Sequence, residues 1–159
     1  GAMRRLAMAY LTVGGIGHLP WMHGTVASVV SVPCFLLLRA ALPPGPLPAL
    51  LLAAALLALS ALALPAIRRC TPASDPDQRW IVIDEVIGTG VAILPVFLFP
   101  VAVTPYVVAG VTLFRVFDIA KPLGIGSIDR RKTPLSVILD DAAAGAYAML
   151  CASALLTVL

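Results

Sequence analysis

Acidic residues gather in four short polar segments of this chain, and each segment borders a long apolar run. Six of the eight carboxylates lie there, at Asp84-Glu85, Asp118, Asp129 and Asp140-Asp141. A charged side chain beside lipid-like sequence is costly unless it is paired, hydrated or bound to a metal. Adjacent acidic pairs brought together also repel, unless a cation neutralises them. Hard oxygen ligands favour Mg²⁺ over softer metals, so these acids predict a magnesium site.

Two glycines follow the acidic pairs at helical spacing. Gly88 lies four residues after Asp84, and Gly145 lies four residues after Asp141. A glycine one turn beyond an acid allows a neighbouring helix backbone to approach closely. This spacing favours two helices that cross and bring their acids together. The alternative is that each pair simply begins a helix, where the helix dipole favours negative charge.

Basic residues lie among the later acids. Arg115, Asp118 and Lys121 are spaced three residues apart, which predicts that they share one helix face. Two cations beside an acid can hold a phosphate next to a metal ligand. Arg130 follows in a basic segment, residues 129–132. An alternative for the bases of residues 115–132, and above all for Arg131 and Lys132, is an anchor on anionic lipid.

A glycine-rich segment, residues 14–28, leads into Thr25 and Ser28 near a predicted helix start. Backbone N–H groups there could bind an anion, although turn formation and capping explain the same residues. His18 and His23 fit a structural or interfacial role. The chain has no Gly-x-Ser-x-Gly elbow and no Walker A lysine. Metal-assisted hydrolysis of a phosphate ester remains as the favoured chemistry.

Composition places these residues in a membrane protein. Hydrophobic residues make up 60% of the 159 residues, charged residues 12%, and the mean hydropathy is +1.01. A soluble domain carries about twice that charge. The net charge of +3 is clustered, with no basic stripe interleaved with aromatics, which excludes a nucleic-acid partner. We expect a single domain over residues 3–159, with Gly1-Ala2 as the remnant of a cleaved tag.

Several apolar stretches are long enough to enter a membrane. Residues 46–67 carry no charge and can cross about 30 Å of hydrocarbon at about 1.5 Å per residue. Residues 26–42 form a second candidate, joined to the first by a Pro-Pro-Gly-Pro turn. Residues 86–114 are interrupted by prolines, so they form either one kinked crossing or two shorter helices. The last apolar helix is expected over residues 142–159.

The charges favour two shorter helices over one kinked crossing. With turns at residues 43–46 and 99–105, every charge except Arg39 falls on one side of the membrane. Basic residues accumulate on cytoplasmic loops. We therefore predict an all-α integral membrane protein with about five membrane-associated helices and its polar segments at the cytoplasmic face. The alternative is a helical protein peripheral to the membrane.

Taken in order, the polar segments resemble the phosphatidylglycerophosphatase A family over residues 15–145. The resemblance rests on a glycine-rich segment, Asp-Glu-x-x-Gly, Phe-Arg-x-x-Asp-x-x-Lys-Pro, Asp-Arg and Asp-Asp-x-x-Ala-Gly. These match residues 15–28, 84–88, 114–122, 129–130 and 140–145. His23 and Gly124 stand where the family usually has proline, and residues 133–136 lack its usual glycines.

The resemblance implies Mg²⁺-dependent removal of the terminal phosphate from phosphatidylglycerophosphate at the cytoplasmic side of the bacterial inner membrane. Alternatives are a phosphatase of another anionic lipid, or a non-catalytic transporter or scaffold. The predicted catalytic residues are Asp84, Glu85, Asp118 (base or ligand) and Asp141. The predicted Mg²⁺ ligands are Asp84, Glu85, Asp140 and Asp141. The predicted substrate-binding residues are Thr25, Arg115, Lys121 and Arg130.

Overall fold

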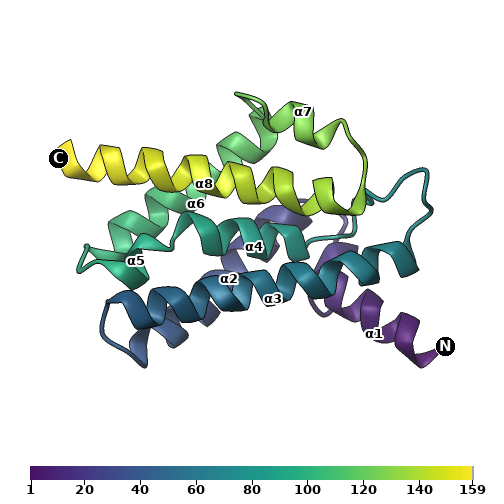
Figure 1. Ribbon diagram of the computed structural model, residues 1–159, viewed down its shortest axis with the longest axis horizontal. Helices are drawn as coiled ribbons and strands as arrows, with labels where there is room; N and C mark the ends of the chain where they lie inside the picture. Colours follow the sequence, from purple (N-terminus) through teal and green to yellow (C-terminus); the bar gives the residue numbers. More distant parts are fainter. Residues whose placement is uncertain (159) are drawn as a thin grey trace.

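The computed structural model describes residues 1–158, and this part of the chain is helical, without a strand (Figure 1). In chain order the elements are α1 (Ala2–Leu11), η1 (Ile16–His18), α2 (His23–Ala40), α3 (Pro46–Cys70), α4 (Ile83–Ala92), α5 (Pro95–Leu98), α6 (Val103–Ala120), α7 (Ile125–Asp129) and α8 (Pro134–Val158). Helices α2, α3, α6 and α8 are long and apolar enough to cross a membrane. The prediction of an all-α, multi-helical membrane protein is confirmed.

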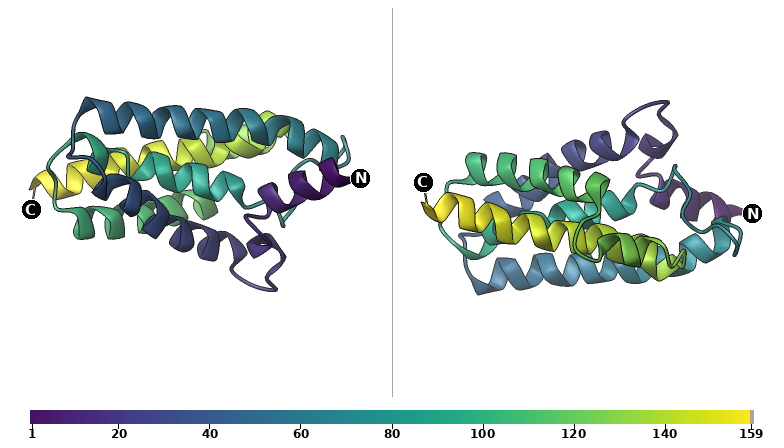
Figure 2. Two further views of the ribbon diagram at one scale, coloured as in Figure 1. Left: turned by 90° about the horizontal axis from the view of Figure 1, so that it is seen from below. Right: turned by 90° about the horizontal axis from the view of Figure 1, so that it is seen from above.

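Helix α4 lies at the centre of the bundle, with the four long helices around it (Figure 2). It is only 10 residues long, or about 15 Å, and seven of these residues are buried. Pro95 lacks a backbone N–H and begins the separate short helix α5, so the apolar run does not continue as one straight helix. The fifth membrane-associated helix of the prediction is thus the pair α4–α5, enclosed by the other helices.

Two turns lie at one end of the bundle, near α5 on the left of Figure 1. Residues 41–45 connect α2 to α3, and residues 99–102 connect α5 to α6. Both turns fall where the prolines predicted them, which excludes the single kinked crossing. Arg39 lies beside these turns, and its Nε donates to the carbonyl oxygen of Val96 at 2.8 Å. Its Nη1 donates to the carbonyl oxygen of Leu42 at 3.1 Å.

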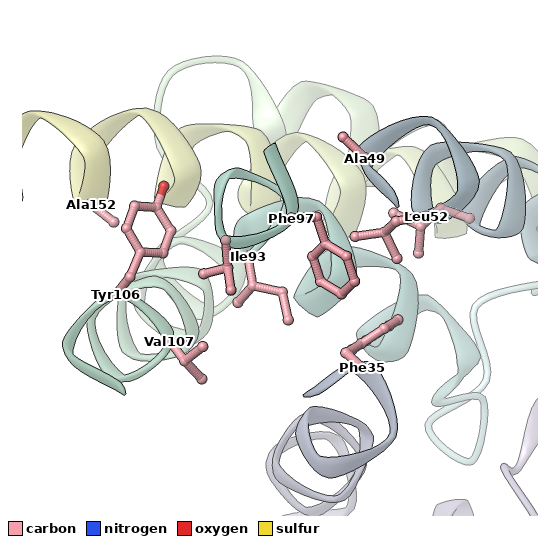
Figure 3. Packing of buried hydrophobic residues seen from close by; sticks show 10 residues of the cluster. Phe35, Ala49, Leu52, Ile93, Phe97, Tyr106, Val107 and Ala152 are labelled. Atoms are coloured by element: carbon pink, nitrogen blue, oxygen red, sulfur yellow. The ribbon is translucent and has the colours of Figure 1, made fainter. Parts of the chain in front are cut away.

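The largest hydrophobic cluster fills this same end of the bundle (Figure 3). Phe35, Leu52, Phe97, Tyr106 and Ala152 meet there from five different helices. Between membrane helices, close side-chain packing and internal hydrogen bonds replace the exclusion of water as the source of stability. The cluster therefore joins α2, α3, α5, α6 and α8 at the end of the bundle where Arg39 is the only charged side chain of the described residues, and we refer to it as the uncharged end.

The opposite end carries the polar connections and the charged residues other than Arg39. Helix α1, the connection at residues 71–82 and helix α7 all lie toward this end, at the right of Figure 1. Helix α1 packs against α3, and the hydroxyl of Tyr10 donates to the carbonyl oxygen of Leu59 at 2.5 Å. The first turn of α4, the last turns of α6 and the first half of α8 reach the same end, which brings the acidic segments together.

Candidate active site

Three carboxylates from three helices converge at the charged end of the bundle. Glu85 comes from α4, Asp118 from α6 and Asp141 from α8. One oxygen of each lies within 4.8 Å of the others, a spacing at which all three can bind one metal ion. Helix α8 packs along both α4 and α6, which fixes the relative positions of these residues. We refer to Glu85, Asp118 and Asp141 as the acidic trio.

The crossing of α4 and α8 depends on the two glycines that follow the acidic pairs. A Cβ atom at Gly145 would collide with the carbonyl oxygen of Gly88. A Cβ atom at Gly88 would overlap the ring of Phe114 and lie 2.8 Å from the carbonyl oxygen of Asp141. The structure therefore shows the close helix approach that the glycine spacing predicted.

Arg115 joins two members of the acidic trio. Its Nη1 atom is paired with Oε2 of Glu85 and lies 2.8 Å from Oδ2 of Asp118. The three side chains are only 13–18% exposed, so solvent screens these charges weakly. Arg115 and Asp118 share a face of α6, as their spacing predicted. The guanidinium thus offsets part of the negative charge of the trio.

Lys121 pairs with a different set of acids. Its Nζ lies 2.5 Å from Oδ2 of Asp140 and 3.0 Å from Oδ1 of Asp129. The prediction that Lys121 shares a helix face with Arg115 and Asp118 is wrong, because α6 ends at Ala120 and Lys121 adopts a left-handed conformation, φ +47°. Pro122 explains this end, since proline disfavours helical geometry in the residue before it.

The contacts of Lys121 also set its protonation. Burial disfavours the ammonium form, but the hydrogen bonds and charges of Asp140 and Asp129 outweigh it and raise the pKa of Lys121. Burial likewise opposes the charged form of Asp129, while Lys121 lowers the pKa of that carboxyl below its ordinary value. Lys121 is therefore a permanent cation that links α7 to α8.

Asp84 and Asp140 lie beside the acidic trio, and both are buried. Oδ1 of Asp84 accepts a hydrogen bond from the backbone N–H of Glu85 at 3.0 Å. Oδ1 of Asp140 accepts the equivalent bond from Asp141 at 3.0 Å, and its other oxygen meets Lys121. Of the four predicted metal ligands, the structure places Glu85 and Asp141 in the trio and these two next to it.

The start of α2 abuts the site. A Cβ atom at Gly24 would collide with Oε1 of Glu85 and lie 3.3 Å from Nη2 of Arg115. Thr25 follows Gly24, so its backbone lies near the acidic trio. Within the described residues, no hydrogen bond joins the Thr25 side chain to the trio. His23, to which the sequence assigned no chemical role, has a buried Nδ1 without a hydrogen-bond partner. No motif in the sequence marks this atom, because its environment comes from tertiary packing.

Arg130 stands apart from the trio in the structure. Its side chain is exposed, and Nη2 donates to Oγ of Ser127 at 3.0 Å. Its place on the connection after α7 leaves it at the charged end of the molecule, where it can reach an anion that approaches from solvent. Its role in substrate binding stays a prediction.

The donor set suits a divalent cation. Five carboxylates gather here, Asp84, Glu85, Asp118, Asp140 and Asp141, and the two cations Arg115 and Lys121 pair with only three of them, Glu85, Asp118 and Asp140. Oδ2 of Asp141 is buried without a hydrogen-bond partner in the structure, which is unfavourable for a carboxylate oxygen. A hard cation bound by oxygens of the trio would satisfy this atom and reduce the repulsion among the acids. These residues therefore fit Mg²⁺, with Glu85, Asp118 and Asp141 as the ligands that the geometry favours.

The chain is similar to known proteins along most of its length. The sequence model of phosphatidylglycerophosphatase A matches residues 9–156, nearly the whole chain. A protein of Bacteroides thetaiotaomicron named "Putative phosphatidylinositol-3-phosphatase" is 35% identical over 81 residues. That match covers 46% of this chain and 46% of the relative, so the chain spans about half the length of that protein. No solved structure matches the chain.

Proposed function

Because the chain belongs to the phosphatidylglycerophosphatase A family, we propose that it removes the terminal phosphate of phosphatidylglycerophosphate, leaving phosphatidylglycerol. The family consists of phosphoric monoester hydrolases that act on phospholipid. The observation that carries the proposal is the acidic trio at the charged end of four apolar helices. A phosphorylated headgroup at the membrane surface would meet the trio there while its acyl chains stay in the bilayer.

The trio would hold Mg²⁺, which supplies positive charge for the phosphoryl oxygens of the substrate. Arg115 would keep Glu85 and Asp118 in place, because one guanidinium nitrogen contacts both carboxylates. Asp118 is the proposed base or ligand, and Asp84 and Asp140 would add negative charge around the ion. Oxygen ligands suit hard cations such as Mg²⁺ better than metals that prefer sulfur or imidazole.

Cationic and hydroxyl groups around the trio would bind the phosphate. Lys121 lies one residue beyond α6 and holds Asp140, so it can orient that acid and attract the anion at the same time. Arg130 is exposed at the same end, and Thr25 lies in the first turn of α2 beside Gly24. Water is the proposed nucleophile, and a nearby carboxylate would take its proton.

We place the charged end at the cytoplasmic face of a bacterial inner membrane. Arg4, Arg5, Arg68, Arg69 and the basic residues 130–132 all lie in segments at this end. Basic residues of short loops accumulate on the cytoplasmic side of membranes. The substrate would then be reached from the cytoplasmic leaflet.

A second lipid phosphate deserves a direct comparison, because the Bacteroides relative carries the name of a phosphatidylinositol-3-phosphatase. Phosphatidylinositol 3-phosphate presents the same chemical group, a phosphate monoester on a lipid headgroup. A transporter or scaffold is less consistent with the structure, since an ion path requires polar groups through the depth of the membrane. Here the acidic trio and its cations lie at one end.

The test is phosphate release from phosphatidylglycerophosphate in mixed micelles, with Mg²⁺ and with EDTA. We expect release that requires Mg²⁺ and exceeds the release from phosphatidylinositol 3-phosphate and from phosphatidic acid. Faster release from one of the other lipids would replace the proposed substrate. The enzymatic proposal would be overturned if the protein released phosphate from none of these lipids while its circular-dichroism spectrum showed that the helical fold was intact.

A further inference from the structure

An apolar groove runs along the face of the bundle opposite α2. Its walls are α3 and α8, its floor is α4, and its volume is about 620 Å³. Figure 1 shows α3 and α8 on either side of α4. Residues that line the walls and floor include Leu57, Ala61, Leu64, Ile87 and Leu139. Any membrane helix touches lipid, but this surface is concave, so it can hold one chain in a fixed position.

The depth of the groove matches one leaflet of a bilayer. On α3 its lining follows one helical stripe over residues 53–64. Those residues span about 17 Å at about 1.5 Å per residue. Half of a hydrocarbon layer of about 30 Å is about 15 Å, which is the depth that a lipid tail occupies. The groove therefore has the length of an acyl chain that starts at the charged end.

A second, cationic recess lies beyond the groove along α3 and α8 at that end. Arg68 lies one helical turn after Leu64, and Pro134 directly precedes Leu135 on α8. Both Arg68 and Pro134 line a separate cavity of about 270 Å³, together with Thr71 and Pro76. Arg68 is exposed and forms no ion pair with an acid of the described residues. A guanidinium free of acidic partners at the end of an apolar groove suits a lipid phosphate.

The groove is distinct from the acidic trio. On α4, Ile87 and Val91 face the groove, whereas Gly88 contacts the backbone of Asp141. On α8, Ile138 and Leu139 line the groove just before the acidic pair. A lipid in the groove would thus lie against α4 and α8, two of the three helices that carry the acidic trio, on the side away from the trio. The phosphate of this lipid, bound at Arg68, would therefore lie away from the acidic trio.

From these features we propose that the α3–α8 groove binds one anionic glycerophospholipid that is not a substrate. One acyl chain lies between α3 and α8, and the headgroup phosphate contacts Arg68. The bound lipid fills the space over α4 and so stabilises its packing against α8. This site is additional to the proposed phosphatase reaction and does not depend on it.

The experiment measures lipid binding to the delipidated full chain in detergent by native mass spectrometry. The probe is phosphatidylserine, an anionic lipid that is neither the proposed substrate nor its product, and phosphatidylcholine with the same chains is the comparison. We expect one tightly held phosphatidylserine per chain. Arg68→Gln should weaken it about tenfold, the loss of one charge-assisted phosphate contact, and Arg69→Gln should leave it unchanged.

A bulky residue in the groove tests the position of the acyl chain. Ala61→Trp would fill the groove, whereas Ala58→Trp places the same side chain on an exposed part of α3 outside the groove lining. We expect only Ala61→Trp to abolish tight binding, with the helical spectrum of both variants retained. Equal effects of the two variants, or equal affinity for both lipids, would overturn the proposal. A change from dimer to monomer in Ala61→Trp without loss of lipid would assign the groove to a second copy of the chain instead.

Discussion

Gly145 of α8 lies directly on the carbonyl oxygen of Gly88 of α4, so closely that a Cβ atom at Gly145 would collide with this oxygen. Each glycine follows an acid by one helical turn, Gly88 after Asp84 and Gly145 after Asp141. The contact therefore determines how near the two acidic pairs come. Backbone-to-backbone packing, rather than attraction between the acids themselves, brings like charges together here.

Gly145→Ala tests this contact. The added methyl group must push α8 away from α4, and such overpacking costs about 1–3 kcal/mol of unfolding free energy. We expect a lower thermal midpoint in detergent and a larger loss of phosphatase activity, because the acidic trio would separate. The control is Gly110→Ala, whose Cβ would lie 3.3 Å from the carbonyl oxygen of Ala92 and needs only a small adjustment. Equal effects of the two substitutions would contradict the role given to Gly145.

Asp141→Asn tests the proposed metal ligand. The substitution keeps the size of the side chain and removes its charge, so kcat should fall on the order of 10²-fold or more if metal charge stabilises the reaction. Titration calorimetry with Mn²⁺ as a substitute ion should show weaker binding. Asp75→Asn, in the exposed connection before α4, is the matched control and should retain both properties. Turnover near the wild-type value at saturating Mg²⁺ would remove Asp141 from this role.

Asp129→Asn tests the link between α7 and α8 through its pH dependence. Lys121 lowers the pKa of Asp129 in the folded protein. The ionised carboxylate therefore stabilises the fold fully at pH values above 3.8, the ordinary pKa of this group. This stabilisation is lost as the pH falls below 3.8 and through the lowered pKa that Asp129 has in the folded protein. We expect the variant to unfold at a lower temperature than the wild type at neutral pH. The difference should shrink in acid, and a difference independent of pH would exclude the ion pair as its cause.

Tyr106→Phe tests the uncharged end of the bundle separately from the site. The Tyr106 hydroxyl lies 2.7 Å from Oγ of Ser153 and donates to the carbonyl oxygen of Met149 at 3.1 Å. Interhelical hydrogen bonds between membrane helices contribute about 0.6 kcal/mol on average, so we expect a small loss of stability. Phosphate release should be unchanged in the folded variant. A large loss of activity at full stability would show that the two ends of the bundle are coupled.

Local sequence signals predicted much of this structure. Clusters of proline and glycine at residues 43–46 and prolines at residues 95–105 favour turns, so both turns at the uncharged end could be located. Long uncharged runs identified the membrane helices, and the glycines after Asp84 and Asp141 identified the helix crossing. The fold class follows from these features, which act within a few residues of one another, and the family resemblance followed from the order of the short polar segments.

Pairings between distant residues could not be predicted in the same way. The sequence placed Lys121 on the face of Arg115, but the helix ends before it and Asp140 becomes its partner. Likewise, nothing in the sequence predicted that Arg115 pairs with Glu85, 30 positions earlier, and its expected role in holding phosphate stays a prediction. Such contacts depend on how the helices are arranged in space. The sequence offers each cation several acids as possible partners, and spacing along the chain does not distinguish among them.

The distribution of charge along the bundle has an electrical consequence. The acidic trio, Arg115 and Lys121 all lie at one end, and Arg39 near the other end is fixed by hydrogen bonds to two backbone carbonyls. A transmembrane voltage does work only on charge that moves through its field, about 2.3 kcal/mol per elementary charge for each 100 mV. No ionised side chain has to travel across the bilayer for the trio to act. Turnover should therefore proceed at the same rate in energised and in depolarised membranes.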